Sequence, residues 1–181
     1  MATEPSTGRG LTVRRARPGD LEQLVLLWRQ FHTSHYRYDR DYYRLKPMRQ
    51  ALAATRKHYA VRIADRNAVF LVAVEGRRVV AFLLGTLGFR PPVMPRTRTF
   101  SLNAAFVLPR LRGRGVFSML FARLRRRLLR RRRVKRVELL VDVHNPAVTA
   151  YEHLGFRKLH YKMIQVLGTA RRQVRRGQVE G

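Results

Sequence analysis

The sequence predicts a single α/β domain in which one mixed β-sheet carries helices on its faces. The chain has 181 residues and 45% of them are hydrophobic, which is enough apolar material for a core and excludes a wholly disordered chain. Runs of β-branched residues alternate with segments of helical periodicity in the order β-α-α-β-β-β-α-β-α-β. No repeat or linker divides residues 11–167, so we expect one domain there, a disordered tail at residues 1–10 and a basic tail at residues 168–181.

The N-terminal third is expected to hold a strand and two helices. Residues 11–13 alternate as a short strand, and Asp20 is a suitable N-cap for the helix that follows it. Apolar residues then recur at helical spacing: Leu21, Leu24, Val25, Trp28 and Phe31. The segment 32–46 is aromatic, charged and irregular, and Pro47 is expected to begin a second helix that ends near Ala64.

The central strands are predicted from runs of β-branched residues. Residues 68–74 and 79–87 are joined by four residues that include a glycine, which predicts a hairpin. A proline-rich loop over residues 88–98 follows, and the next strand is expected over residues 99–108.

The C-terminal half is expected to alternate helix and strand. A helix is predicted to follow a glycine-containing turn and to extend to about Arg133, because its apolar residues fall at four-residue spacing. Residues 137–143 are predicted as a buried strand. Asn145, followed by proline, should begin a short helix, and residues 156–166 should hold the last strand.

Charge and cysteine content exclude several classes of function. The chain has 39 Lys and Arg against 11 Asp and Glu, a formal net charge of +28, which favours anionic partners. With no cysteine it can form no disulfide, thiolate metal site or acetyl-cysteine intermediate, and we predict no metal site. No apolar run, residues 79–84 included, is long enough to span a bilayer, and the N-terminus lacks the apolar core of a signal peptide. We therefore expect a cytoplasmic protein with no membrane partner.

The most informative segment is residues 107–116, Val-Leu-Pro-Arg-Leu-Arg-Gly-Arg-Gly-Val, between a predicted strand and a predicted helix. Glycines allow the backbone to approach a ligand closely, and the first N–H groups of a helix are free to donate. With the helix dipole, Arg112 and Arg114, these groups would form an anion site suited to a pyrophosphate. The spacing matches neither a Walker loop nor a dinucleotide-binding motif. On these residues alone, a tight turn into a helix is an equally good interpretation.

This segment resembles the Arg/Gln-x-x-Gly-x-Gly/Ala signature of the GNAT family of N-acetyltransferases. Arg112, Gly115 and Phe117 align with it when Val107 and Pro109 keep the usual spacing, and Phe117 replaces the small residue of the family. An alignment that begins at Arg110 instead also matches the residue types of the signature, but Val107 and Pro109 then lose the spacing that is usual in the family. The family binds acetyl-CoA through this loop. The resemblance therefore implies a cofactor site formed by Phe106, Val107, Arg112, Gly113, Arg114, Gly115, Val116, Phe117 and Ser118.

A second resemblance lies near the end of the predicted domain. The family's Asn-x-x-Ala-x-x-x-Tyr-x-x-x-Gly-Phe pattern aligns its tyrosine with Tyr151 and its Gly-Phe pair with residues 155–156. Asn145 lies one residue closer to the tyrosine than in the family, and His144 stands at the asparagine position. The resemblance, which covers about residues 11–166, implies that Tyr151 protonates the departing coenzyme A thiolate and that Asn145 contacts the cofactor. From the residues alone, core packing by Tyr151 and helix capping by Asn145 remain alternatives.

The chemistry of acetyl transfer to an amine places further demands on the chain. The amine, whose pKa is about 10, must lose a proton before it attacks the thioester. The oxyanion needs an N–H donor, which the strand end at Phe106 and Val107 can supply. Without a cysteine, direct transfer is the simpler mechanism. A water chain and five side chains remain candidates for the general base, with none singled out: Asp39, Asp41, Glu138, Asp142 and His144.

The sequence thus predicts an acetyl-CoA-dependent N-acetyltransferase whose amine acceptor is a small molecule or a protein. The alternative is a basic binding module of the same fold that associates with RNA or ribosomes. Between Arg77 and Val137 there are 17 Arg, one Lys and no acid, and eight of the Arg fall within residues 123–133. A solvated helix face explains these arginines equally, and no RNA-reading motif is present. We expect any affinity for nucleic acid to be weak.

Overall fold

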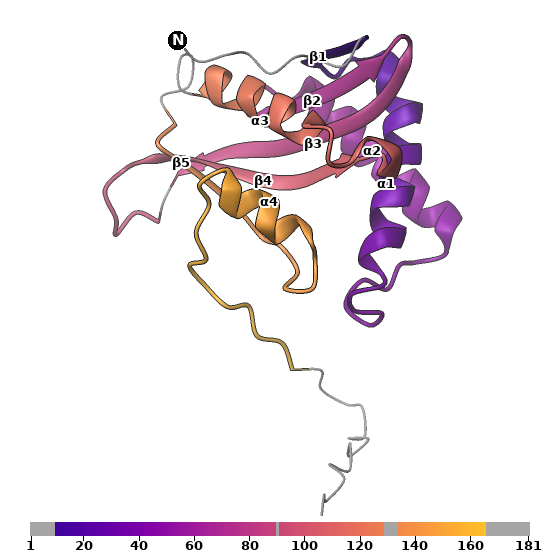
Figure 1. Ribbon diagram of the computed structural model, residues 1–181. Helices are drawn as coiled ribbons and strands as arrows, with labels where there is room; N and C mark the ends of the chain where they lie inside the picture. The colour runs from indigo at the N-terminus through magenta and orange to yellow at the C-terminus, as the bar shows by residue number, and fades with distance from the viewer. Residues whose placement is uncertain (1–9, 90, 129–133, 166–181) are drawn as a thin grey trace, which may run out of the picture.

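The structure, a computed structural model, describes residues 10–89, 91–128 and 134–165. In this part of the chain a single five-stranded sheet has the order β1-β2-β3-β4-β5 (Figure 1). The strands are β1 (Leu11–Arg15), β2 (Ala68–Glu75), β3 (Arg78–Phe89), β4 (Arg98–Val107) and β5 (Arg136–Leu139). Neighbours are antiparallel except for β4 and β5, which run parallel. The predicted mixed sheet is confirmed.

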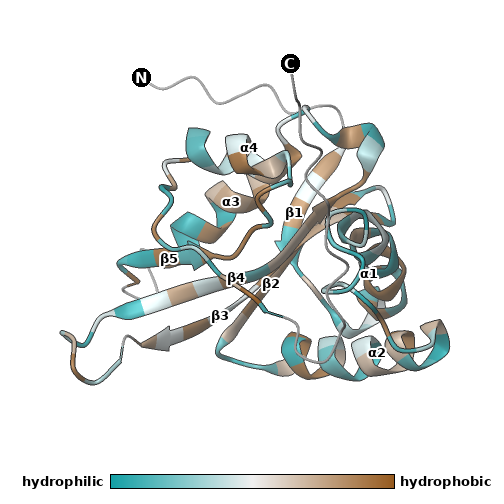
Figure 2. Ribbon diagram, turned by 90° about the horizontal axis from the view of Figure 1, so that it is seen from below, coloured by the Kyte–Doolittle hydropathy of each residue, from teal (hydrophilic) through white to brown (hydrophobic). Residues whose placement is uncertain are grey.

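Four helices cover the two faces of the sheet: α1 (Leu21–His35), α2 (Met48–Ala64), α3 (Val116–Arg127) and α4 (Ala147–His153). Helices α1 and α2 lie on one face, and α3 and α4 lie on the other (Figure 2). Two short 3-10 turns, Pro18–Asp20 and Pro109–Leu111, lead into α1 and toward α3. None of the helices in the described ranges is long and apolar enough to cross a membrane.

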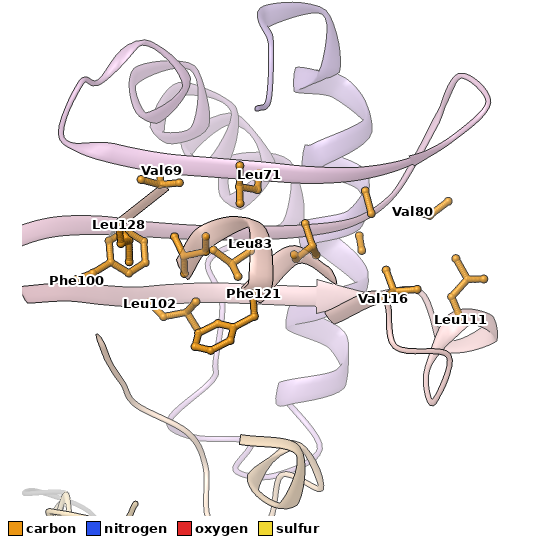
Figure 3. Packing of buried hydrophobic residues seen from close by; sticks show 14 of the residues in the cluster. Val69, Leu71, Val80, Leu83, Phe100, Leu102, Leu111, Val116, Phe121 and Leu128 are labelled. Carbon is orange, nitrogen blue, oxygen red and sulfur yellow. The ribbon is translucent and has the colours of Figure 1, made fainter. Parts of the chain in front are cut away.

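Strand β2 explains why the core has two halves. Its side chains are buried on both faces, because alternate residues of a strand point to opposite sides. Val69 and Leu71 pack with α3 on one side, whereas Phe70 and Val72 pack with α1 and α2 on the other. The α3 side also receives Leu83, Phe100 and Leu102 from the neighbouring strands (Figure 3). The central strands therefore hold both helical layers in fixed positions.

Strand β5 differs from its prediction. It is an edge strand of four residues whose side chains are half-buried or exposed, not a buried strand over residues 137–143. Leu140 and Val143, which follow it, are 83% and 77% exposed. The expected strand over residues 156–166 is not formed in residues 156–165, where Tyr161 and Met163 are 88% and 91% exposed. Both segments have strand-like composition, but a strand also needs a neighbour to pair with its backbone.

Asp20 precedes α1 as predicted, but its side chain does not cap that helix. Its carboxylate accepts two hydrogen bonds from the Arg14 guanidinium, at 2.7 and 2.8 Å, and one from the backbone N–H of Arg17 at 2.7 Å. These donors, Arg14 first, hold the pKa of Asp20 below its usual value. Asp20 therefore connects β1 to the following turn through these hydrogen bonds.

Three predictions fall wholly or partly outside the described residues. The expected end of α3 near Arg133 lies in the range 129–133, and the two predicted tails lie almost entirely in residues 1–9 and 166–181. The domain boundaries at residues 11 and 167 therefore remain predictions.

Candidate active site

A bulge in β4 opens the sheet beside β5. Strands β3 and β4 pair in register on both sides of Asn103, but this residue has no partner, because Leu84 pairs with Ala104 and Gly85 pairs with Leu102. One extra residue in an antiparallel pair bends its strand. Strand β4 pairs with β5 only up to Leu102. Among the described residues, 103–107 consequently continue along β3 without a strand on their other side.

The backbone N–H of Val107 points into this gap. Leu108 donates a hydrogen bond from its N–H to the carbonyl of Val80 at 3.0 Å, so the adjacent pair, Val107 and Ala81, is the type that forms no hydrogen bonds across the strands. The N–H and C=O of Val107 therefore face away from β3. The C=O accepts a bond from Arg112 Nε at 3.2 Å, whereas the N–H has no acceptor among the described residues.

The glycine-containing turn that follows β4 presents a row of backbone donors. Gly113 and Gly115 have φ angles of +73° and +72°, a conformation that favours glycine, and a Cβ at either position would meet no atom within 4 Å. The N–H groups of residues 113–118 find no backbone acceptor in the described structure, and the first helical bond runs from Met119 to Gly115. These free donors lie at the N-terminus of α3, the positive end of its dipole.

The arginines of this turn have different surroundings. Arg112 folds back over the end of β4, with its guanidinium 5.6 Å from the centre of the Phe106 ring. Arg110 instead forms an ion pair with Glu75, the last residue of β2. Arg114 is exposed beside Gly113 and Gly115. The residue aligned with the family signature, Arg112, is thus the one that contacts both Phe106 and Val107.

Tyr151 lies on α4 and packs against the start of α3. The centre of its ring is 5.5 Å from that of Phe117 and 5.8 Å from that of Phe156, and Phe117 also stacks on Phe121 at 6.1 Å. Burial raises the pKa of the Tyr151 hydroxyl, so this group keeps its proton at neutral pH. The hydroxyl has no hydrogen-bond partner among the described residues. The ring of Tyr151 therefore packs against its neighbours, as one of the two interpretations predicted, while its hydroxyl keeps a proton that it can donate.

The segment before α4 contains three of the predicted residues, Asp142, His144 and Asn145, in one hydrogen-bonded turn. Asn145 accepts a bond from the backbone N–H of Ala147 at 2.9 Å and so closes the turn into α4, but the N-cap residue of α4 is Pro146 and not Asn145 as predicted. A cofactor contact by Asn145 stays a prediction. His144 donates its backbone N–H to Asp142 at 2.9 Å, and its Nδ1 lies 3.2 Å from the same carboxylate oxygen.

Asp142 also connects this turn to the aromatic segment between α1 and α2. The hydroxyl of Tyr43 lies 3.5 Å from Asp142 Oδ2, and burial together with the carboxylate raises the pKa of Tyr43 to about 12. The Tyr43 ring meets His32 and His35 of α1 edge to face. Sequence reasoning missed Tyr43, because nothing distinguishes it from its tyrosine neighbours before the chain is folded.

The remaining candidate bases have local roles in the structure. Asp39 accepts the backbone N–H groups of Asp41 and Tyr42, at 3.0 and 2.9 Å. Glu138 of β5 accepts a bond from the Ser101 hydroxyl at 2.9 Å. In the described part of the chain, no three metal-ligating side chains lie together.

The family assignment follows from a comparison of the sequence with known families. Residues 24–156 match the acetyltransferase (GNAT) family, a range that includes the bulge, the glycine-containing turn and Tyr151. The chain belongs to the GNAT acetyltransferase family. This family uses acetyl-CoA as its co-substrate. No curated protein sequence matches the chain.

Solved GNAT-like structures share the fold at low sequence identity. A tetramutant of the BH1408 protein from Bacillus halodurans is 22% identical, with a TM-score of 0.76 over 86% of this chain and 99% of that one. A predicted acetyltransferase from Clostridium acetobutylicum, solved with acetyl-CoA, is 18% identical, with a TM-score of 0.67 over 87% and 96%. The aminoglycoside N-acetyltransferase AAC(6')-Iy, in complex with CoA, is 17% identical, with a TM-score of 0.67 over 91% and 99%.

Proposed function

We propose that the chain is an N-acetyltransferase that moves an acetyl group from acetyl-CoA directly to an amine. The observation that carries this proposal is the row of free N–H groups at residues 113–118. This row follows β4 and the short turn Pro109–Leu111, and it lies beside Tyr151 through Phe117. The turn would bind the cofactor, the N–H of Val107 would stabilise the oxyanion and the Tyr151 hydroxyl would protonate the thiolate, and the reaction also needs an acceptor for the proton of the amine.

The chain's residues fit the cofactor at the turn. The donors of residues 113–118 would bind its pyrophosphate, with support from the α3 dipole and from the positive side chains of Arg112 and Arg114. When bound, acetyl-CoA supplies an activated acetyl thioester. The N–H of Val107 would then donate to the carbonyl oxygen and stabilise the negative charge that develops there as the amine attacks.

Tyr151 would supply the proton that the sulfur of the leaving group needs. Its ring is held by contacts with Phe117 and Phe156, so the hydroxyl oxygen Oη has a defined position. A raised pKa keeps this proton in place until a thiolate forms nearby.

We propose that the acceptor approaches from the side of the Tyr43–Asp142 contact. The protein carries a large positive charge, and the segment 32–46 itself has Arg37, Arg40, Arg44 and Lys46 against Asp39 and Asp41. Asp142, beside Tyr43, is the carboxylate that would attract a cationic amine here. A small-molecule amine is consistent with the fold likeness to the aminoglycoside N-acetyltransferase AAC(6')-Iy. A water chain or one of the candidate acids would accept the amine proton.

The test measures the thermal stabilisation of the protein by acetyl-CoA. We expect acetyl-CoA to raise the unfolding temperature of the wild type, because a ligand that binds only the native state stabilises it. Gly115→Asp should remove this shift, because it adds a side chain and a negative charge where the phosphates bind. Gly76→Asp is the matched control, because Gly76 also has a positive φ, +58°, and open space around it, but lies in the turn between β2 and β3. Asp tolerates this backbone conformation better than most residues.

Two outcomes would contradict the proposal: no stabilisation of the wild type, or equal stabilisation of a folded Gly115→Asp variant. Transfer itself is tested by mass spectrometry with a panel of amines that includes an aminoglycoside. Direct transfer predicts an acetylated amine and no acetylated protein after incubation with acetyl-CoA alone. An acetylated chain that passes its acetyl group to the amine would contradict direct transfer.

A further inference from the structure

An open hollow of about 350 Å³ lies at the opposite end of β4 from the glycine-containing turn. Five residues line it: Phe89, Arg96, Thr97, Arg98 and Lys135. Three of them are cations, one is aromatic, and none is acidic. Strand β4 begins at Arg98 and ends at Val107, so at about 3.3 Å per residue the hollow is roughly 30 Å from the cofactor turn. This distance separates it from the candidate active site.

The aromatic wall of the hollow is a ring with arginines on it. Phe89, the last residue of β3, is 51% exposed. The guanidinium of Arg96 lies 4.9 Å from the centre of its ring, and that of Arg98 lies 5.7 Å away. Because the two guanidiniums lie over the ring, another flat group can stack on the exposed part of the ring or on the guanidinium planes themselves. Nucleic-acid bases are flat groups that carry phosphates nearby.

Chain topology brings further positive charge to this end of the sheet. Helix α3 runs back from the cofactor turn and ends on the side where β3 and β4 are connected (Figure 1). Its last turn exposes Arg125 and Arg126, and the chain then returns to β4, where the N–H of Lys135 donates to the carbonyl of Arg98 at 3.2 Å. The nearest acid along the chain, Glu138, accepts a bond from Ser101. No acid occurs between Arg77 and Val137 to offset this charge.

We propose that this hollow binds single-stranded nucleic acid, with an unpaired base stacked on Phe89 and the adjacent phosphates held by Arg96, Arg98 and Lys135. Charge alone would attract any polyanion. The exposed ring favours a single strand, because only an unpaired base presents a face to it. The site is independent of acetyl transfer, so it does not rest on the function proposed above.

The test separates the contribution of base stacking from that of charge. The affinity of the protein for a short labelled RNA of mixed sequence is measured by fluorescence anisotropy at several salt concentrations. The RNA is used both as a single strand and as a duplex. Arg96→Gln and Lys135→Gln should weaken binding of both RNAs and reduce the slope of log affinity against log salt by about 0.7 for each lost contact to a single strand. Phe89→Ala should weaken binding of the single strand roughly 5- to 100-fold and leave the salt slope and the duplex affinity unchanged.

Matched controls lie elsewhere on the surface. Lys57→Gln removes an exposed cation of α2, and Tyr161→Ala removes an aromatic side chain that is 88% exposed. Neither should change the affinity by more than about twofold, as expected for a position without phosphate or base contacts. If the controls weaken binding as much as the hollow variants, or if Phe89→Ala weakens single strand and duplex equally, the proposal is wrong.

A measurement on the wild type keeps the proposal testable if a variant fails to fold. Ultraviolet cross-linking of a uridine-containing single strand, followed by peptide mass spectrometry, should place the cross-link within residues 89–98 or at Lys135. Cross-links spread over the arginine-rich surface, or no binding at physiological salt, would overturn the assignment.

Discussion

The two ends of β4 are both suited to bind anions, but they use different parts of the chain. At the Val107 end the donors are backbone N–H groups, fixed by two glycines with positive φ and by the start of α3. At the Arg98 end the donors are side chains on the surface around an exposed ring. Backbone donors cannot move away from their ligand, whereas long side chains lose conformational entropy when they bind. The first end is therefore suited to one ligand in one orientation, and the second to a repeated charge.

The largest expected effect is on the rate of acetyl transfer at the Val107 end, and it comes from a change at Tyr151. Tyr151→Phe should lower kcat by roughly 100-fold, the range of general acid catalysis, and leave the affinity for acetyl-CoA nearly unchanged. The ring contacts with Phe117 and Phe156 survive this change, so the fold should not be affected. Steady-state kinetics and calorimetric titration with acetyl-CoA measure the two quantities separately.

RNA affinity is the internal control for this variant, because Tyr151 is remote from the Arg98 end. It should equal that of the wild type. If kcat is unchanged, Tyr151 is only a packing residue, and another group must supply the proton.

The second largest expected difference between the two ends is in how strongly salt weakens the binding of their ligands. Three phosphate contacts with a single strand give a slope of about −2 in log affinity against log salt, so a rise from 50 to 200 mM should weaken RNA binding roughly 20-fold. Acetyl-CoA affinity should change by about threefold or less over the same range, because fixed backbone dipoles supply most of its contacts. Parallel titrations of both ligands measure this difference. Equal salt dependence would mean that side-chain charge dominates at both ends, which contradicts the backbone site.

The glycine-containing turn at the Val107 end could be predicted from the sequence because its backbone features are local. Positive φ angles at Gly113 and Gly115 and the start of a helix at Val116 are properties of neighbouring residues. The bulge at Asn103 could not be predicted, because it is defined by the residues of β3 that pair on either side of it. The only trace in the sequence is an asparagine in a strand, where this residue is uncommon.

The distinction between local and non-local requirements also explains the other agreements and differences between the predictions and the structure. The hairpin of β2 and β3 was predicted correctly, because it is formed by consecutive segments and a short turn. Strand β5 is shorter than its apolar run, because its pairing ends where β4 bends away at the bulge. Asp20 is the N-cap residue of α1 as predicted, but its carboxylate makes no capping bond, because the competing donor, Arg14, lies on the preceding strand. The hollow at Arg98 has no motif, since its residues come from β3, β4 and the segment after α3.

The smallest effect concerns Phe117, the residue that departs from the family signature at the cofactor end. Its ring packs between Tyr151 and Phe121. Phe117→Ala should lower kcat about fivefold, because an aromatic contact worth about 1 kcal/mol no longer positions the Tyr151 ring, while the affinity for acetyl-CoA changes less. Phe117→Tyr keeps the ring and should retain most of the activity, so the pair of variants separates positioning from simple loss of folding. Kinetics, thermal unfolding and cofactor titration of both variants provide the measurement. If Phe117→Ala instead binds acetyl-CoA more tightly and turns over faster, the small residue of the family is the better fit here, and the ring of Phe117 obstructs the cofactor.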